Sequence, residues 1–314
     1  MGNIMEIILA IAPPLLILLL GGLCRKNGWL RVEADASLSV LTVRVLYPCF
    51  FFFHLVGNED TLSVGNFAFV ILAGFICIGA GFGCAYIVSK IMGIESKVIP
   101  PFTFCSGIFN YGFFAFPVAA SIFGEQIIAK IILFNLGVET AIWTLGVWIL
   151  ASNQFRFSRL VNPPIISIIL AVLVREIGGE EIVPSFAWEI ISMLGGCAIP
   201  IGLLLIGGNF ADLIMKFRLS DGKKVEISAI LVRLVLVPLL MFCYALFAPM
   251  PVEMNWLKDI LIVQIAMPAG IFAIVIVKNY KGDTETAMRV ILSTMIGCLF
   301  STPIWLLLGL KYLK

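Results

Sequence analysis

Residues 105–117, CSGIFNYGFFAFP, interrupt a long apolar run with Asn110, Gly112 and Pro117. Glycine and proline both weaken the ladder of backbone hydrogen bonds that holds a helix together. Inside a membrane, such a break is tolerated only where protein or a wet cavity satisfies the freed backbone groups. Taken alone, the segment is better explained by a simple kink in a helix.

A second segment, residues 264–270, has the same character and the sequence QIAMPAG, with Gln264, Pro268 and Gly270. The two segments occupy equivalent places in the two halves of the chain, so we expect them to cross near its centre. Half-helices made by such breaks direct N–H groups and a partial positive charge at the crossing. A carboxylate is the ligand expected there, and the side-chain amides of Asn110 and Gln264 add hydrogen-bond donors and acceptors without charge.

The breaks lie within a chain built almost entirely of apolar runs. Of 314 residues, 61% are hydrophobic and 13% charged, and the mean hydropathy is +1.08. Soluble domains carry about 25% charged residues, and a membrane-spanning helix needs about 20 apolar residues. Ten such runs are predicted, at residues 4–24, 36–57, 66–90, 98–123, 126–151, 160–177, 185–213, 225–248, 255–278 and 284–310. We therefore expect an all-α, multi-pass membrane protein.

The positive charges alternate from one joint between runs to the next. The joints after the odd-numbered runs hold 14 Lys and Arg, and the even-numbered joints with the C-terminal tail hold 5. Cytoplasmic joints carry the excess of Lys and Arg. This predicts a protein of the plasma (inner) membrane, with both termini on the extracytoplasmic side.

The two halves of the chain, residues 1–155 and 156–314, repeat each other at a nearly constant offset. The matched positions are Pro13-Pro14 with Pro163-Pro164, Arg25 with Arg175, Gly28 with Gly178, Pro48 with Pro200, and Pro117 with Pro268. Because each half holds five runs, the second half must enter the membrane from the opposite side. Inverted repeats of this kind are typical of secondary carriers, although simple duplication also yields membrane proteins that transport nothing.

Polar residues at membrane depth are functional candidates by default. Glu139 in the fifth run is a candidate proton carrier, or it forms a structural ion pair with Arg233 in the eighth. His54 either faces a cavity or lies harmlessly near the interface, and Arg44 extends its charge to the membrane surface. Asn209 is a weaker candidate.

Metal, cofactor and nucleic-acid chemistry find little support. The eight cysteines lie in or at the ends of apolar runs, no CxxC pair exists, and the only histidine is His54. Such cysteines are typical small core residues. The basic residues are spread over the loops, so we expect no nucleic-acid partner, no metal and no cofactor.

Several motifs together resemble the auxin efflux carrier family, which includes the plant PIN carriers and bacterial organic-acid permeases. They are the proline-then-Phe-His stretch of residues 46–55, the Asn-x6-Pro segment 110–117, residues 264–271 followed by 278–280, and the bacterial-type gap from Tyr280 to Pro303.

The resemblance implies a ten-span elevator-like carrier of anionic carboxylates. It implies a scaffold of spans 1, 2, 6 and 7, which supports dimer formation, and a moving transport domain of spans 3–5 and 8–10. Asn110, Pro117 and Pro268 would line the crossover, with Gln264 close by. The full predicted substrate-binding set is Asn110, Gly112, Pro117, Gln264, Pro268, Gly270 and His54.

One departure concerns coupling. Plant members carry an acidic residue early in the third span, whereas residues 67–75 contain none. Auxin is therefore a doubtful substrate, and Glu139 is the remaining candidate proton carrier. Both proton and sodium stay open as coupling ions.

Three functions remain open from the sequence. The leading hypothesis is a carrier of a small organic anion, such as the dicarboxylates malate or malonate. A sodium/proton antiporter shares the crossed architecture but usually presents carboxylates beside the crossing, and segments 105–117 and 264–270 contain none. A membrane enzyme or receptor subunit would be expected to show a polar catalytic cluster or a soluble signalling domain.

Overall fold

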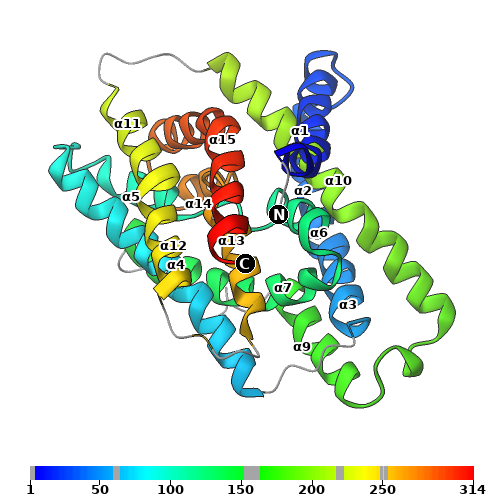
Figure 1. The fold of residues 1–314 in the computed structure, drawn as a ribbon. Coiled ribbons are helices and arrows are strands. Elements are labelled where there is room, and N and C mark those ends of the chain that lie inside the picture. The colour runs from blue at the N-terminus through cyan, green and yellow to red at the C-terminus, as the bar shows by residue number, and fades with distance from the viewer. Residues whose placement is uncertain (1–3, 59–63, 152–162, 217–222, 248–249, 251–253) are drawn as a thin grey trace.

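The computed structural model describes residues 4–58, 64–151, 163–216, 223–247, 250 and 254–314, which form helices joined by short turns (Figure 1). Four helices are long and continuous: α1 (Ile4–Lys26), α4 (Val64–Ile91), α10 (Ser185–Lys216) and α15 (Thr284–Tyr312). Three others contain a π-helical segment: α2–η1–α3 (Val32–Leu41, Thr42–Leu46, Tyr47–Val56), α7–η2–α8 (Gln126–Ala141, Ile142–Gly146, Val147–Leu150) and α11–η5–α12 (Lys224–Ile230, Leu231–Leu236, Val237–Phe247). These seven are long and apolar enough to cross a membrane, which makes the chain a multi-pass membrane protein.

The remaining three apolar runs form shorter helices. The sixth run is α9 (Pro163–Glu176), which is followed by the 3-10 turn η4 (Gly179–Ile182). The fourth run is divided into α5 (Ile99–Gly107) and α6 (Ala115–Phe123), and the ninth into α13 (Trp256–Ile265) and α14 (Ala273–Asn279). Both helix breaks predicted from the glycine and proline positions are therefore confirmed.

Glycines allow two pairs of helices to pack with their backbones in contact. A Cβ on Gly207 of α10 would lie 1.9 Å from the carbonyl oxygen of Leu18 in α1. A Cβ on Gly137 of α7 would lie 1.7 Å from the carbonyl oxygen of Ile71 in α4. Small residues permit this close approach in membrane helices, where van der Waals packing replaces the hydrophobic effect as the driving force.

These two pairs lie in different parts of the molecule. In Figure 1, α1, α3, α9 and α10 lie on one side, α4, α11, α12 and α15 on the other, and α7 between them. Helices of the same side contact one another (α1 with α10, α3 with α9, α4 with α5, α11 with α15) more extensively than they contact helices of the other side.

Each side carries a partly buried ion pair. Arg25 at the end of α1 lies 2.6 Å from Asp35 of α2 and 3.4 Å from Asp212 of α10. Arg289 of α15 donates two hydrogen bonds, of 2.7 and 2.9 Å, to Glu226 of α11. Both pairs tie together helix ends that the charge count assigns to the same membrane face.

The predicted boundary between the halves, at residues 155 and 156, lies outside the described residues. So do Arg156, Arg159 and Arg218, which contribute to the predicted charge asymmetry.

Candidate substrate site at the crossing of two broken helices

The two helix breaks pair with each other through their backbones. The Asn110 N–H donates to the Pro268 carbonyl at 2.8 Å, and the Gly270 N–H donates to the Ile108 carbonyl at 3.0 Å. Phe109 and Ala269 thereby form an antiparallel bridge. We call residues 108–112 and 266–270 the crossover. The pairing satisfies backbone groups that two broken helices would otherwise leave bare at membrane depth.

Gly270 permits the two chains to approach closely. A Cβ at this position would lie 3.2 Å from both the Phe109 carbonyl oxygen and a methyl group of Ile108. Any larger residue would push the chains apart, which is the physical reason for glycine here. Gly112 is also confined, because a Cβ there would lie 3.2 Å from the Tyr47 hydroxyl of α3.

Side chains from neighbouring helices satisfy further backbone groups of the crossover. Asn135 of α7 donates from Nδ2 to the Tyr111 carbonyl at 3.0 Å. On the other break, Thr302 of α15 donates to the Ala266 carbonyl at 2.6 Å, and Thr294 accepts from the Ala269 N–H at 3.3 Å. Each break is thus held by a helix that comes later in the chain, α7 for the first and α15 for the second.

The predicted amides and prolines converge on this region. Asn110 is 6% exposed and belongs to the paired backbone, and Gln264 is 0% exposed in the last turn of α13. Within the described residues, neither Nε2 nor Oε1 of Gln264 has a hydrogen-bond partner. Pro268 accepts the backbone bond from Asn110, and Pro117 lies in the first turn of α6, where proline is tolerated.

Glu139 is joined to the crossover through Tyr111. Its carboxylate accepts hydrogen bonds from the Tyr111 hydroxyl and, at 2.8 Å, from Nε1 of Trp143. No ion pair joins Glu139 to Arg233 among the described residues, so the structural ion pair that the sequence left open does not form. The carboxylate instead accepts bonds from uncharged donors, one of them on the crossover itself.

Arg233 lies in η5, which contacts α4, α5 and α15. It is 0% exposed, and its three guanidinium nitrogens have no hydrogen-bond partner within the described part of the chain. Its guanidinium carbon lies 5.2 Å from the centroid of the Phe109 ring. An arginine over an aromatic face gains a cation–π interaction, but its charge stays uncompensated.

The other polar candidates lie away from the crossover. His54 lies 2.9 Å through Nδ1 from the Phe50 carbonyl oxygen, and its ring packs 4.2 Å from that of Phe50. Phe50 in turn contacts Phe116 of α6, so His54 is one aromatic ring removed from the broken helix. Arg44 is exposed, and Asn209 is half-buried on α10.

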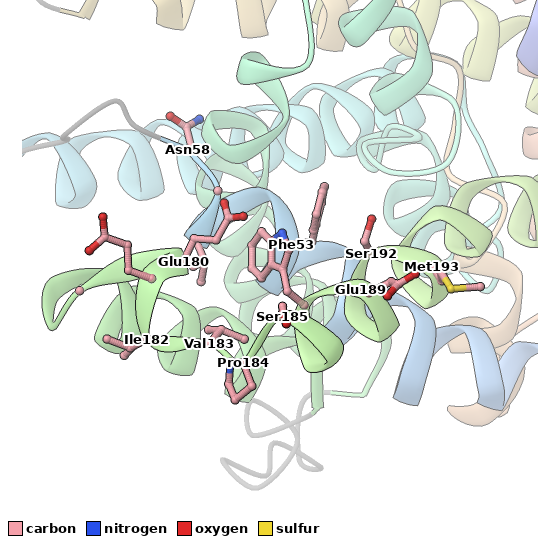
Figure 2. A pocket seen from close by; sticks show the side chains of 15 residues that line it. Phe53, Asn58, Glu180, Ile182, Val183, Pro184, Ser185, Glu189, Ser192 and Met193 are labelled. Atoms are coloured by element: carbon pink, nitrogen blue, oxygen red, sulfur yellow. The ribbon is translucent and has the colours of Figure 1, made fainter.

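A cavity lies elsewhere, between the end of α3, η4 and the first turns of α10 (Figure 2). Its volume is about 1140 Å3, and its lining includes Phe53, Trp188 and the carboxylates of Glu180, Glu181 and Glu189. None of the predicted substrate-binding residues lines it. Three exposed carboxylates would repel an anion, so we place the candidate site at the crossover.

Sequence reasoning missed the residues that hold the crossover in place. They are Tyr111, Asn135, Trp143, Thr294 and Thr302. One signal was present, because Asn135, Glu139 and Trp143 are spaced four residues apart and must share a helix face. The two threonines offer no comparable pattern, and only the fold brings them to the break.

Paired helix breaks inside a helical membrane protein are typical of transport proteins. The chain belongs to the family described as "Membrane transport protein", of the auxin efflux carrier type, which matches residues 6–158 and 151–306. The resemblance drawn from the motifs is thereby confirmed. The members of this family are transporters, so the chain is not an enzyme and the membrane-enzyme hypothesis is wrong.

Three curated relatives are similar to this chain. "Uncharacterized transporter MJ1031" of Methanocaldococcus jannaschii is 23% identical over 96% of this chain and 97% of its own length. An "Uncharacterized transporter" of Methanothermobacter thermautotrophicus is 22% identical over 93% of this chain and 94% of its own. "Protein ECM3" of Saccharomyces cerevisiae is 28% identical over 43% of this chain and 24% of its own length.

Proposed function

We propose that this chain is a secondary carrier that moves a small organic anion, a carboxylate, across the plasma membrane. The observation that carries the proposal is the backbone pairing of the two breaks, Asn110 N–H to Pro268 and Gly270 N–H to Ile108. This pairing places Asn110 in the crossover. The Gln264 side-chain amide, which has no hydrogen-bond partner among the described residues, lies two residues before the second crossover segment, residues 266–270. Amide donors in a site shielded from water recognise a carboxylate more strongly than they would in water.

The proposed architecture has ten spans arranged as two inverted halves, residues 1–155 and 156–314. The seven long helices supply seven spans, and α9, α5–α6 and α13–α14 supply the other three. Ring contacts at one membrane face support this count. Lys314 lies over the Phe123 ring at the end of α6, and Lys130 of α7 lies over the Trp256 ring at the start of α13. In the ten-span topology these ends all lie outside, together with both termini.

The proposal includes a division into a scaffold and a transport domain, which the packing supports. We assign α1, α2–α3, α9 and α10 to the scaffold, which would also carry a homodimer contact, and the remaining helices to the transport domain. Aromatic rings fill the boundary between them. The ring of Phe113, the residue directly after the first crossover segment, packs 5.0 Å from that of Tyr47 and occupies the space left by the missing side chain of Gly202 in α10. An elevator-like movement would slide the crossover along this apolar boundary.

Glu139 is our proposed proton carrier. It is a membrane-embedded carboxylate that hydrogen-bonds to the crossover, through the hydroxyl of Tyr111. Protonation there would weaken its hold on Tyr111 and so couple a proton to the crossover. Sodium remains the alternative coupling ion.

A sodium/proton antiporter is the competing function. Cation binding at a crossing needs carboxylates within it, whereas the crossover residues contain none and Glu139 reaches them only through the hydroxyl of Tyr111. The carboxylate of the ninth run, Asp259, lies in the first turn of α13, at the end away from the crossover. The fully buried Arg233 contacts Phe109 of the crossover and would repel a cation.

The test is purified protein in liposomes, offered labelled malate, malonate and pyruvate with and without sodium and pH gradients. We expect saturable uptake of at least one carboxylate, with competition by the unlabelled acid. Protein-free liposomes measure leakage. Saturable uptake of a cation but of none of the acids would replace the carrier proposal with the antiporter.

A further inference from the structure

Arg233 presents a problem of charge that the fold does not solve. A buried arginine normally pairs with an acid, because removing its charge from water is costly. Here the side chain is 0% exposed and its nitrogens have no partner among the described residues. Ionisable groups kept at membrane depth mark the path of a substrate or an ion.

The segment that carries Arg233 packs against a helix with buried hydroxyls, and no acid among the described residues forms an ion pair with Arg233. The segment η5 packs against α5, whose Thr103 and Ser106 hydroxyls are buried without a hydrogen-bond partner in the described chain. Ser228, three residues before η5, is also buried, and its hydroxyl likewise has no hydrogen-bond partner in the described chain. These groups can donate hydrogen bonds, and donors together with a guanidinium suit an anion.

The backbone at Arg233 is also unusual. It lies in a π-helical segment, and such segments occur frequently at functional sites. Arg44 lies in a π-helical segment as well, but that side chain is exposed and lines a shallow surface pocket with Val40 and Leu41. The two arginines therefore share local structure and differ in burial, which makes Arg44 a matched control.

We propose that Arg233 is the positive charge that selects a carboxylate at the crossover, with Phe109 holding the guanidinium in the absence of an anion. Arginine binds carboxylates through two parallel hydrogen bonds, which the flat face of Phe109 cannot provide. An anion entering beside Asn110 would neutralise the charge, whereas a cation or an uncharged amide would not. This inference rests on the proposed function and adds the residue that sets the charge of its substrate.

The experiment compares wild type with Arg233→Met, Arg233→Lys and Arg44→Met in liposomes. The probes are labelled malate, malonate and pyruvate, each competed with its own amide. For the acids that wild type takes up, we expect Arg233→Met to raise the half-saturating concentration about tenfold or more, because charged hydrogen bonds are lost. The preference of the Arg233→Met variant for the acid over its amide should also fall. Arg233→Lys should keep the preference with weaker affinity, and Arg44→Met should behave as wild type.

The outcomes separate the inference from the function on which it rests. Wild-type affinity and acid preference in Arg233→Met would overturn the role of Arg233 and leave the carrier intact. If the Met variant does not purify as a monodisperse protein, Arg233→Lys decides, and loss of acid preference in that folded variant overturns the inference. Absence of uptake of every acid by wild type would overturn the proposed function itself.

Discussion

Single polar side chains hold the crossover together and give it its chemistry. Asn135, Thr294 and Thr302 satisfy backbone groups of the two breaks, whereas the side chain of Gln264 has no partner in the described chain. A buried amide without a partner costs free energy. The first group is therefore structural, and Gln264 is available to a substrate.

Asn110→Ala is expected to weaken carboxylate binding by roughly tenfold, because it removes an amide from a buried site where each hydrogen bond counts for about 1–3 kcal/mol. The backbone bond from residue 110 to Pro268 remains, so folding should be retained. The measurement is the half-saturating concentration for uptake in liposomes. Asn279→Ala, at the exposed end of α14, serves as the control. Unchanged affinity in Asn110→Ala would move the site away from the crossover.

Glu139→Gln tests the proposed proton carrier. Tyr111 and Trp143 donate to different oxygens of the Glu139 carboxylate. Glutamine replaces one of these oxygens with an NH2 group, which cannot accept, so one of the two bonds is lost in this geometry. We expect uptake to fall several-fold and to stop responding to an imposed pH gradient. Glu95→Gln, on an exposed loop where Glu95 pairs with Lys97, should keep both properties. Full pH-dependent uptake by the Glu139→Gln variant would exclude Glu139 as the proton carrier.

Whole helices are held at fixed spacing by glycines that touch a neighbouring backbone. Gly137 is the tightest of these contacts between α7 and α4. Asn135 and Glu139, which bond to Tyr111 of the first break, also belong to α7. The packing of α7 against α4 therefore fixes where these two side chains lie.

Gly137→Ala should therefore lower the stability of the protein by about 1–3 kcal/mol, the usual effect of overpacking. Thermal unfolding in detergent measures the change. The matched control is Gly83→Ala in α4, where an added Cβ meets nothing within 4 Å. That substitution should leave the melting temperature unchanged or raise it, because alanine favours a helix over glycine. Equal melting temperatures for the two variants would contradict the packing argument.

The topology of the whole molecule can be tested at the joint between α6 and α7. In the ten-span arrangement the exposed Glu125 lies outside, because α5 and α6 together cross the membrane. If only the seven long helices crossed, the same joint would lie in the cytoplasm. Glu125→Cys, in a background without the eight native cysteines, should therefore react with a membrane-impermeant maleimide in intact cells.

The exposed Lys97, between α4 and α5, provides the control for that experiment. Lys97→Cys should react only after the cells are permeabilised, because both arrangements place it inside. Labelling of Glu125→Cys that likewise requires permeabilisation would contradict the ten-span topology.

The sequence by itself determined the helices and the positions of the breaks. Apolar length predicts a membrane helix because lipid admits no unsatisfied backbone, and the glycines and prolines of residues 105–117 and 264–270 marked where the ladder fails. These are local properties, readable from one stretch of chain. The amides Asn110 and Gln264 could be identified for the same reason, since they lie within or beside the breaks.

Only the tertiary structure decided which groups meet. Glu139 bonds to Tyr111 and Trp143 rather than to Arg233, and Arg233 lies over Phe109, 124 positions earlier in the chain. Thr294 and Thr302 reach a break more than 20 residues before them. Such contacts depend on the rotation and height of one helix against another. Packing through side chains and glycine contacts sets both quantities, and no local pattern records them.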